Sequence, residues 1–440
     1  MPTLTPRVCA ALTDLAASPL PESARRAALR TFVNVVGTTI GAGRDRAVDI
    51  AVAHGTPGTA PVLGRRERLD AFTAALATGI AAHLDDFDDT HLRTVIHPGA
   101  ATLAAVLPLG LARKSDGATV LRAFALGCEA QLRLGNAVSP SHYDAGWHIT
   151  GTCGVVGAAV AASVLCGLDA AGTERAVALA TTQTLGHREA LGSMTKPFHP
   201  GKAAANGLLA ALLAERGCTG PADALTVFLD TFADRADPAE LTDGLGERWE
   251  LGLNTFKPYP CGIVAHPAID AALDAAPRVP DPTAVREIVL DCHPLVPELM
   301  GRLAPTDGLQ ARFSAAHTMA AALVDGELTL RQFRDAAVLR PEVARLRNLV
   351  RFAPSDAVRR DEARIAVRLD GGAEVVAHVE HARGSLDRPL TDAELTAKAT
   401  ALIDDDRAAP VLDAAWALPA AAGLDALVAA ATPDERKEAS

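Results

Sequence analysis

The sequence predicts a mainly α protein with a large all-helical domain and a smaller α+β domain. Up to about residue 255, alanine-rich segments carry apolar residues at three- and four-residue spacing or are apolar throughout, which is typical of helices. Strand patterns occur only after Lys257. At roughly 150 residues per domain, the length of 440 residues also favours two or three domains.

The helices expected in the first part are separated by short loops that contain glycine or proline. Those that are apolar on every face should lie in the interior, where glycine and alanine let helix axes approach closely. The expected helices span residues 70–84, 99–113, 120–134, 154–168, 201–216 and 222–232.

The part after Lys257 combines strands and helices. Strand patterns lie at residues 285–290, 364–369 and 374–380, the last two forming a hairpin around Asp370-Gly371-Gly372. Helical patterns lie at residues 310–325, 330–336 and 341–348, and the chain is helical again from residue 392. We therefore assign residues 257–388 to the α+β domain and residues 1–256, rejoined by 389–440, to the helical domain.

The composition is that of a folded, acidic protein. With 49% hydrophobic and 22% charged residues, most of the chain is not disordered. A net charge of −11 disfavours nucleic acid and anionic membrane surfaces as partners. The uncharged stretch 145–168 is interpreted as a buried helix with its preceding loop, not as a membrane span.

The cellular location of the protein is inferred from two features that the sequence lacks. The chain opens without a basic-then-apolar signal, and its seven cysteines form no CxxC pair. We therefore expect a reduced, cytoplasmic protein without structural zinc.

The densest group of ionisable residues is His83-Leu84-Asp85-Asp86-Phe87-Asp88-Asp89-Thr90-His91, followed by His97. Its four carboxylates repel one another unless they are solvated, paired or bound to a metal. Three interpretations stay open: a divalent metal site with Asp and His ligands, a solvated loop, or a catalytic Asp beside a His.

Four loops place a histidine shortly before Pro or Gly at the expected start of a helix. The histidines are His97, His148, His199 and His266. Helix N-termini offer free N–H groups and partial positive charge, so several converging ends would bind carboxylates or phosphates. Ordinary helix capping is the alternative. On the first interpretation, the substrate-binding candidates are His148, Thr152, His199 and Lys202.

Two of the six lysines stand in otherwise uncharged loops. Lys196 follows Thr195, and Lys257 lies close to Tyr259, one of only two tyrosines. Each lysine precedes a proline and should lie on extended or turn backbone. In a cleft, such lysines carry protons or pair with carboxylates, whereas the alternative is a solvated surface lysine. Thr195 and Tyr259 are taken as substrate-binding candidates with them.

Several common enzyme motifs are missing from the sequence. It contains no GxGxxG after a strand, no GxxxxGK[ST] and no GxSxG. Dinucleotide-binding, P-loop and serine-hydrolase classes therefore have little support.

Six ordered segments resemble the MmgE/PrpD family, which includes 2-methylcitrate dehydratases, cis-aconitate decarboxylases and iminodisuccinate epimerases. They extend from residue 85 to 395 and are specific in combination. The segments are DDFDDTH…HPGAATLAAVLPLGLA (85–112), GWHITGTCGVVGAAVAAS (146–163), SMTKPFHPGKAAANGLLAALLAERGCTGP (193–221), FKPYPCGIVAHPAIDA (256–271), LQARFSAAHTMAAALVDG (309–326) and RGSLDRPLTDAEL (383–395).

The resemblance implies a homodimer whose helical domain is closed by the α+β domain as a lid, with a hinge near Lys257. It also implies chemistry without a metal or cofactor. Asp86, Thr90 and His97 match the family's first active-site motif, Lys196 matches the lysine of its TKP motif, and Lys257 matches that of its KPYP motif.

These residues suggest acid/base chemistry at a carbon next to a carboxylate. Lys196 and Lys257 would hold the substrate's carboxylates and stabilise developing negative charge, while His97, oriented by Asp86, would move a proton. His317 of the lid would be the opposite acid or base. It stands where the decarboxylases resemble one another in having a tyrosine, which weakens the decarboxylase assignment specifically.

The sequence therefore predicts a metal-independent lyase that acts on a small di- or tricarboxylate, like a 2-methylcitrate dehydratase or a cis-aconitate decarboxylase. Three alternatives stay open. They are an epimerase of an amino- or imino-dicarboxylate, a metal-dependent hydrolase that uses the cluster at 85–97, and a catalytically inactive carboxylate-binding protein.

Overall fold

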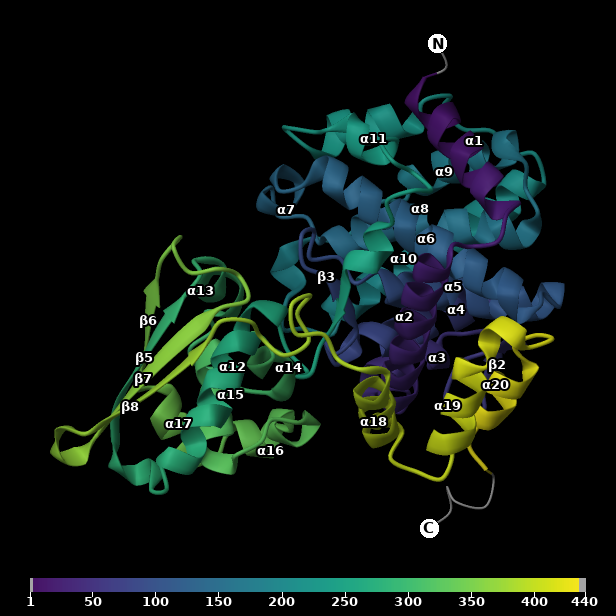
Figure 1. The fold of residues 1–440 in the computed structure, drawn as a ribbon. Coiled ribbons are helices and arrows are strands. Elements are labelled where there is room, and N and C mark those ends of the chain that lie inside the picture. Colours follow the sequence, from purple (N-terminus) through teal and green to yellow (C-terminus); the bar gives the residue numbers. More distant parts are fainter. Residues whose placement is uncertain (1–2, 435–440) are drawn as a thin grey trace.

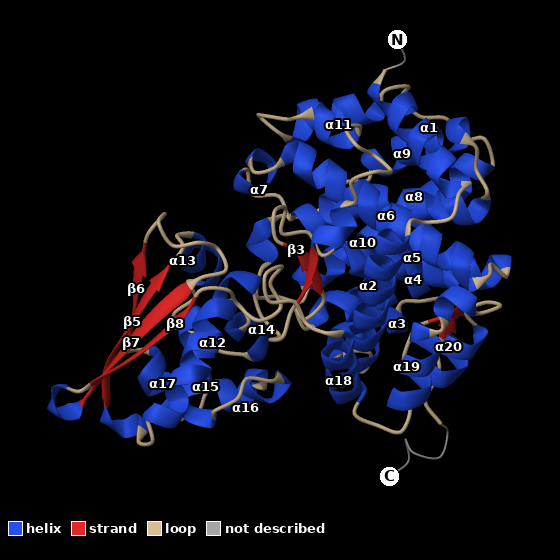
Figure 2. Cartoon of the chain, in the orientation of Figure 1, coloured by secondary structure: helices blue, strands red, loops and turns tan. Residues whose placement is uncertain are grey.

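A computed structural model describes residues 3–434 and is mainly α, as predicted (Figure 1 and Figure 2). The first part of the chain is almost entirely helical. Its helices are α1 (Leu4–Ala16), α2 (Glu22–Gly41), α3 (Arg46–Ala53), α4 (Ala71–Leu84), α5 (Pro98–Arg113), α6 (Gly117–Val138), α7 (Ser141–Asp144), α8 (Ile149–Cys166), α9 (Ala170–Thr181), α10 (Thr195–Glu215) and α11 (Ala224–Phe232).

Helix α8 lies at the centre of this part and packs against α5, α6 and α10. Glycines allow the close approach: a Cβ on Gly157 would lie 2.6 Å from the carbonyl oxygen of Gly127 in α6. Within residues 3–434, α8 alone is long and apolar enough to cross a membrane. Because 89% of that stretch is buried inside the protein, its apolarity is explained by core packing.

The part after Lys257 contains a four-stranded sheet in the order β6-β5-β7-β8, with β5 and β6 parallel and the other pairs antiparallel. Helix α12 packs against β7 and β8, and α15 packs against α12. The strands are β5 (Val285–Cys292), β6 (Val350–Pro354), β7 (Ala363–Leu369) and β8 (Glu374–Val379). The helices are α12 (His266–Ala275), α13 (Leu295–Met300), α14 (Gly308–Ala311), α15 (Ala315–Asp325), α16 (Asp335–Val338) and α17 (Pro341–Arg347).

The chain then returns to the first part, where α18 and α19 pack against α2 (Figure 1). These last helices are α18 (Asp392–Ile403), α19 (Ala408–Trp416) and α20 (Asp425–Ala431). One large hydrophobic cluster combines residues from 8 to 251 with residues from 399 to 431, and a second combines residues from 259 to 377. The domain limits at 257 and 388 stay predictions.

Two short strand pairs complete the fold. β1 (Pro57–Pro61) pairs with β2 (Arg68–Leu69), and β3 (Asp89–His91) pairs antiparallel with β4 (Asn254–Phe256). In the second pair Thr90 lies opposite Thr255, whose Oγ1 donates to the Thr90 carbonyl at 2.5 Å. This pairing brings the acidic cluster beside the segment that leads into Lys257.

Candidate active site

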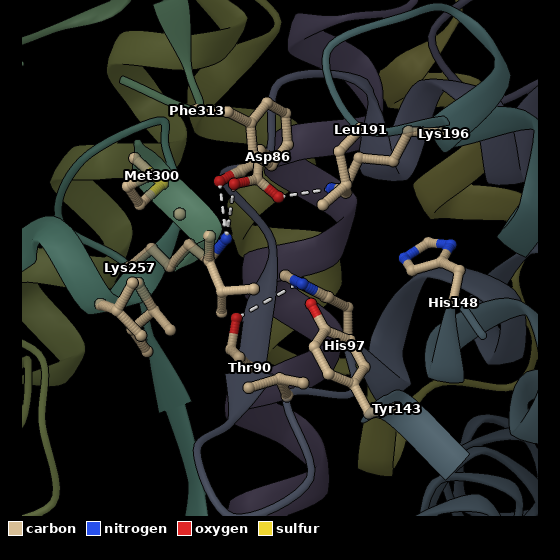
Figure 3. Close-up of a pocket in the computed structure, with 15 residues that line it drawn as sticks. Asp86, Thr90, His97, Tyr143, His148, Leu191, Lys196, Lys257, Met300 and Phe313 are labelled. Carbon is tan, nitrogen blue, oxygen red and sulfur yellow. Dashed lines mark hydrogen bonds and ion pairs between the residues drawn. The ribbon is translucent and has the colours of Figure 1, made fainter. Parts of the chain in front are cut away.

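A pocket lies between the helical part and the α+β part, and side chains from both line it (Figure 3). The empty space between these side chains is about 500 Å³ including the portion open to solvent, of which about 50 Å³ admits the centre of a water molecule. The helical part contributes Asp86, Thr90, His97, Tyr143, His148 and Lys196, and the α+β part contributes Lys257, Met300 and Phe313.

Asp86 lies between two buried lysines. Lys196, in the first turn of α10, places Nζ 2.5 Å from Oδ1 of Asp86, and Lys257, directly after β4, places Nζ 3.1 Å from Oδ2. Lys257 also donates to the main-chain carbonyl of Asp86 at 3.0 Å. Asp86 has a φ of +49°, a left-handed conformation that aspartate adopts more readily than most residues.

The charges of Asp86, Lys196 and Lys257 favour an anionic ligand. Burial alone would raise the pKa of Asp86, but Lys196 and Lys257 outweigh burial and hold this pKa far below its usual range. Burial also lowers the pKa of Lys196, an effect that Asp86 opposes and Lys257 strengthens. Two lysines therefore share one ionised carboxylate, and an incoming carboxylate would complete their pairing.

His97 is oriented by Asp88, which corrects the expectation that Asp86 does so. Nδ1 of His97 lies 3.0 Å from Oδ1 of Asp88 and 3.2 Å from Oγ1 of Thr90. Nδ1 of His83 lies 2.7 Å from the other carboxylate oxygen of Asp88.

The position of the proton on the His97 ring depends on its neighbour Asp88. Burial would raise the pKa of Asp88, but His83 and His97 hold it well below its usual range. Burial lowers the pKa of His97 and brings that of His83 to about 4. A neutral imidazole beside a carboxylate keeps its proton on the facing nitrogen. With its proton on Nδ1, His97 would present an unprotonated Nε2 as a base.

Helix starts account for part of the predicted anion site. α5 and α8 begin directly after His97 and His148, and both histidines line the pocket. α12 begins at His266, whose Nε2 faces the Cys261 carbonyl at 3.3 Å and which does not line the pocket. The start expected after His199 is wrong, because α10 begins at Thr195 and contains His199.

The other substrate-binding candidates lie outside the pocket. Oγ1 of Thr152 lies 2.7 Å from Nε2 of His142. Nζ of Lys202 lies over the ring of Phe72, 4.4 Å from its centroid, and Tyr259 donates to Oδ1 of Asp270 at 2.5 Å. Thr195 is exposed at the start of α10. His199 contacts the pocket only through His148, with 2.9 Å between their Nδ1 atoms.

His317 is not brought to the pocket. It is fully buried in α15, where Nε2 lies 3.1 Å from the Gln332 carbonyl and the ring packs against Phe333. Burial lowers its pKa to about 4. The structure therefore gives no support to His317 as the acid or base opposite His97, and this expectation is corrected.

Tyr143 is a pocket residue that the sequence did not assign to the site. The guanidinium of Arg188 lies 4.4 Å from the centroid of its ring and donates to its carbonyl at 3.0 Å. Burial raises the pKa of Tyr143 to about 12, so its hydroxyl stays protonated. Its rarity, as one of two tyrosines, is the only sequence signal that could have identified it.

Two groups of side chains within residues 3–434 have the composition of a metal site. They are His83, Asp88 and His97, of which His97 lines the pocket, and Asp361, His381 and Asp387 in the α+β part. In the first group, Nδ1 of His83 already makes a hydrogen bond to Oδ2 of Asp88, and Nδ1 of His97 makes one to Oγ1 of Thr90. A metal would have to disrupt these hydrogen bonds.

Comparison with known proteins gives a consistent result. The profile of the MmgE/PrpD N-terminal domain matches residues 7–238, and that of the C-terminal domain matches residues 259–416. Cis-aconitate decarboxylase of Homo sapiens is 30% identical over 351 residues, or 75% of this chain and 72% of its own.

Two fungal proteins are also similar. Cis-aconitate decarboxylase of Aspergillus terreus is 26% identical over 418 residues, which cover 87% of this chain and 85% of its own. The cis-aconitate decarboxylase-like protein oryM of Aspergillus oryzae is 28% identical over 408 residues, or 84% of each. With both of its domains matched in order, the chain belongs to the MmgE/PrpD family.

Proposed function

We propose that this protein is a lyase that removes CO2 from a small unsaturated di- or tricarboxylate by acid/base chemistry, without a metal or cofactor. The observation that carries the proposal is the group of Lys196 and Lys257 around one carboxylate, beside two buried imidazoles. The relatives named cis-aconitate decarboxylases support a lyase and favour decarboxylation over dehydration.

The two lysines and the helix N-termini supply the electrostatic part of the reaction. A substrate carboxylate bound by Lys196 and Lys257 lies beside the starts of α5 and α8, whose N–H groups carry partial positive charge. Loss of CO2 leaves its electron pair on the adjacent carbon, delocalised into the remaining carboxylate. Fixed cations and dipoles lower the energy of that charge more than that of the ground state.

Proton transfer then completes the reaction at carbon. The carbanion needs one proton, and the pocket offers His97, His148 and Tyr143 as ionisable groups on the side of the helical part. With its proton on Nδ1, His97 would present Nε2 as a base that is suited to removing a proton or holding a water molecule. The donor to carbon is therefore a different group.

Two of the three alternatives each have an observation in their favour. The pair of imidazoles in one pocket, His97 and His148, also suits removal and return of a proton in an epimerase. The group of His83, Asp88 and His97 favours a metal-dependent hydrolase. We retain the homodimer and the cytoplasmic location as proposals from the sequence.

Proton NMR in D2O with cis-aconitate, 2-methylcitrate and iminodisuccinate tests the proposal directly. We expect loss of CO2 from cis-aconitate with one deuterium incorporated at carbon, and no change in rate after dialysis against EDTA. Loss of water from 2-methylcitrate or deuterium exchange in iminodisuccinate alone would replace decarboxylation by dehydration or epimerisation. Stoichiometric metal whose removal abolishes turnover would favour the hydrolase.

A further inference from the structure

His148 and His199 form a buried pair of imidazoles behind the pocket. Their Nδ1 atoms lie 2.9 Å apart, with ring centroids 5.1 Å apart. His148 is 5% exposed and His199 is 4% exposed. A bond between two imidazole nitrogens requires one proton, so one Nδ1 donates and the other accepts.

Both rings are neutral at physiological pH. Burial lowers the pKa of His148 well below its usual value, and the nearby His83 and Lys196 lower it further. Burial, together with His83, brings the pKa of His199 to about 4. Each neutral ring therefore carries one proton, on either Nδ1 or Nε2.

This geometry allows two states that differ by a shift of protons. In one, Nδ1 of His148 donates to His199, and Nε2 of His148 is bare at the pocket. In the other, Nδ1 of His199 donates, and Nε2 of His148 carries a proton. No described residue hydrogen-bonds to Nε2 of His148, and this ring lines the pocket (Figure 3).

His97 differs from His148 in this respect. Its Nδ1 faces the carboxylate of Asp88, which accepts protons but does not donate them when ionised. His148 can therefore present an N–H to the substrate while its ring stays neutral, with a second imidazole behind it to replace the proton. The site thus contains one fixed base and one imidazole that alternates between acid and base.

We propose that His148 is the proton donor to the substrate carbon and that His199 supplies its replacement proton through the Nδ1–Nδ1 bond. This inference rests on the proposed function. His148 gives its Nε2 proton to the carbanion, Nδ1 of His148 takes the proton from Nδ1 of His199, and Nε2 of His199 takes a proton from water. After product leaves, water in the pocket returns a proton to Nε2 of His148, the Nδ1 proton of His148 moves back to Nδ1 of His199, and Nε2 of His199 releases its proton to the hydroxide left by the first transfer, so that the pair resets.

His199 is therefore a positioning and relay residue, because it does not line the pocket. The exposed His187 lies next to it, with ring centroids 6.3 Å apart. The His148–His199 pair consequently extends from the pocket towards the exposed His187.

Replacement of His199 by Asn tests this role. An asparagine amide can still bond to Nδ1 of His148 but does not exchange a proton with it. We expect kcat to fall about tenfold or more, within the range of acid–base contributions, with KM within about twofold of wild type. The control is His187→Asn, the same change at the exposed neighbour, which should leave kcat within about twofold.

Added imidazole separates a relay from a structural role. In His199→Ala, imidazole should enter the vacated space and restore kcat saturably, whereas it should leave wild type and His187→Asn unchanged. Wild-type kcat in His199→Asn would overturn the relay. A loss in His199→Ala that imidazole does not restore, accompanied by a raised KM, would also overturn it and assign His199 to packing.

A measurement on the wild-type protein requires neither substrate nor variant. Nitrogen-15 NMR of histidine-labelled protein at pH 7 should show both rings neutral, with one Nδ1–H shared between them. A charged imidazolium at either position would overturn the relay. Absence of turnover by wild type with every polycarboxylate would instead count against the proposed function, so the two failures are distinguishable.

Discussion

Replacement of Asp86 by Asn removes the negative charge that two buried lysines share. Asparagine keeps the shape of the side chain and also tolerates the left-handed backbone at this position, where φ is +49°. An alanine there would add backbone strain, so Asp86→Asn isolates the electrostatic effect.

The magnitude follows from the two contacts. At an effective dielectric constant of about 20, gross attractions over 2.5 and 3.1 Å are about 7 and about 5 kcal/mol. Desolvation offsets most of this, and breaking a buried pair on one side costs about 3–5 kcal/mol net. We therefore expect Asp86→Asn to lower the free energy of unfolding at pH 7 by about 4 kcal/mol.

The pH dependence has a definite sign. Without the carboxylate, the pKa of Lys196 in the folded protein falls further below its unfolded value of about 10.4. The unfolded state then binds more protons over this interval, so the variant gains stability as pH rises. The difference from wild type should shrink between pH 7 and pH 10.

Urea unfolding at pH 7 and pH 10 measures the difference. Turnover should fall by about 100-fold or more because the two ammonium groups lose the carboxylate that positions them. The control is Asp387→Asn, at a carboxylate side chain that is 66% exposed, with an expected change within about 0.5 kcal/mol. Equal stability and turnover of Asp86→Asn and wild type would refute the electrostatic account of this site.

Three further predictions use the same measurements. His97→Asn should lower kcat by about 100-fold with KM little changed, because the amide keeps the contact to Asp88 without the base, while His378→Asn at an exposed imidazole serves as the control. The pKa of Asp89 is raised to about 7 by burial and Asp88, above its unfolded value of about 3.9, so its contribution to stability falls as pH rises between these values. In Asp89→Asn, the free energy of unfolding measured with urea should lack this part of its decrease with pH. An unchanged dependence on pH would contradict the assignment. Arg312 donates to the Asp85 carboxylate at 2.7 Å, so Arg312→Gln should destabilise by about 3 kcal/mol, against no measurable change for the exposed control Arg368→Gln.

The helices were predictable because their signal is local. The expected ranges 70–84 and 99–113 correspond to α4 and α5 within one residue at each end. β5 and the hairpin of β7 and β8 were predictable for the same reason. β6 was missed: it pairs in parallel with β5, and the sequence of a short edge strand does not specify a distant partner.

The start of α10 was misplaced because His199 and the proline after it were interpreted as the loop before a helix. Pro200 lies inside the helix and cannot donate to the Lys196 carbonyl. The helix begins at Thr195, six residues before the expected start at residue 201, which places Lys196 in the first turn and buries His199 on the same helix. The preference of proline for the first helical position thus predicted this helix correctly but misplaced its N-terminus.

Within the acidic cluster, the sequence could not assign the carboxylates to partners. Asp86 and Asp88 are two positions apart and chemically alike, yet one pairs with lysines and the other with histidines. The positive φ of Asp86 turns the chain between them, and β3 begins just afterwards, at Asp89. The partners come from residues 196 and 257, whose positions depend on tertiary packing.

The site and the docking of the two parts of the structure depend on the same interactions. Asp86 binds Lys196 from the helical part and Lys257 at the start of the α+β part, while Asp85 beside it binds Arg312 from the α+β part. Moving the parts away from each other would leave buried charges without partners, at a cost of several kcal/mol for each broken pair. A substrate carboxylate that replaces part of this pairing would lower that cost. Binding of the anion and the relative position of the two parts are therefore coupled through one aspartate.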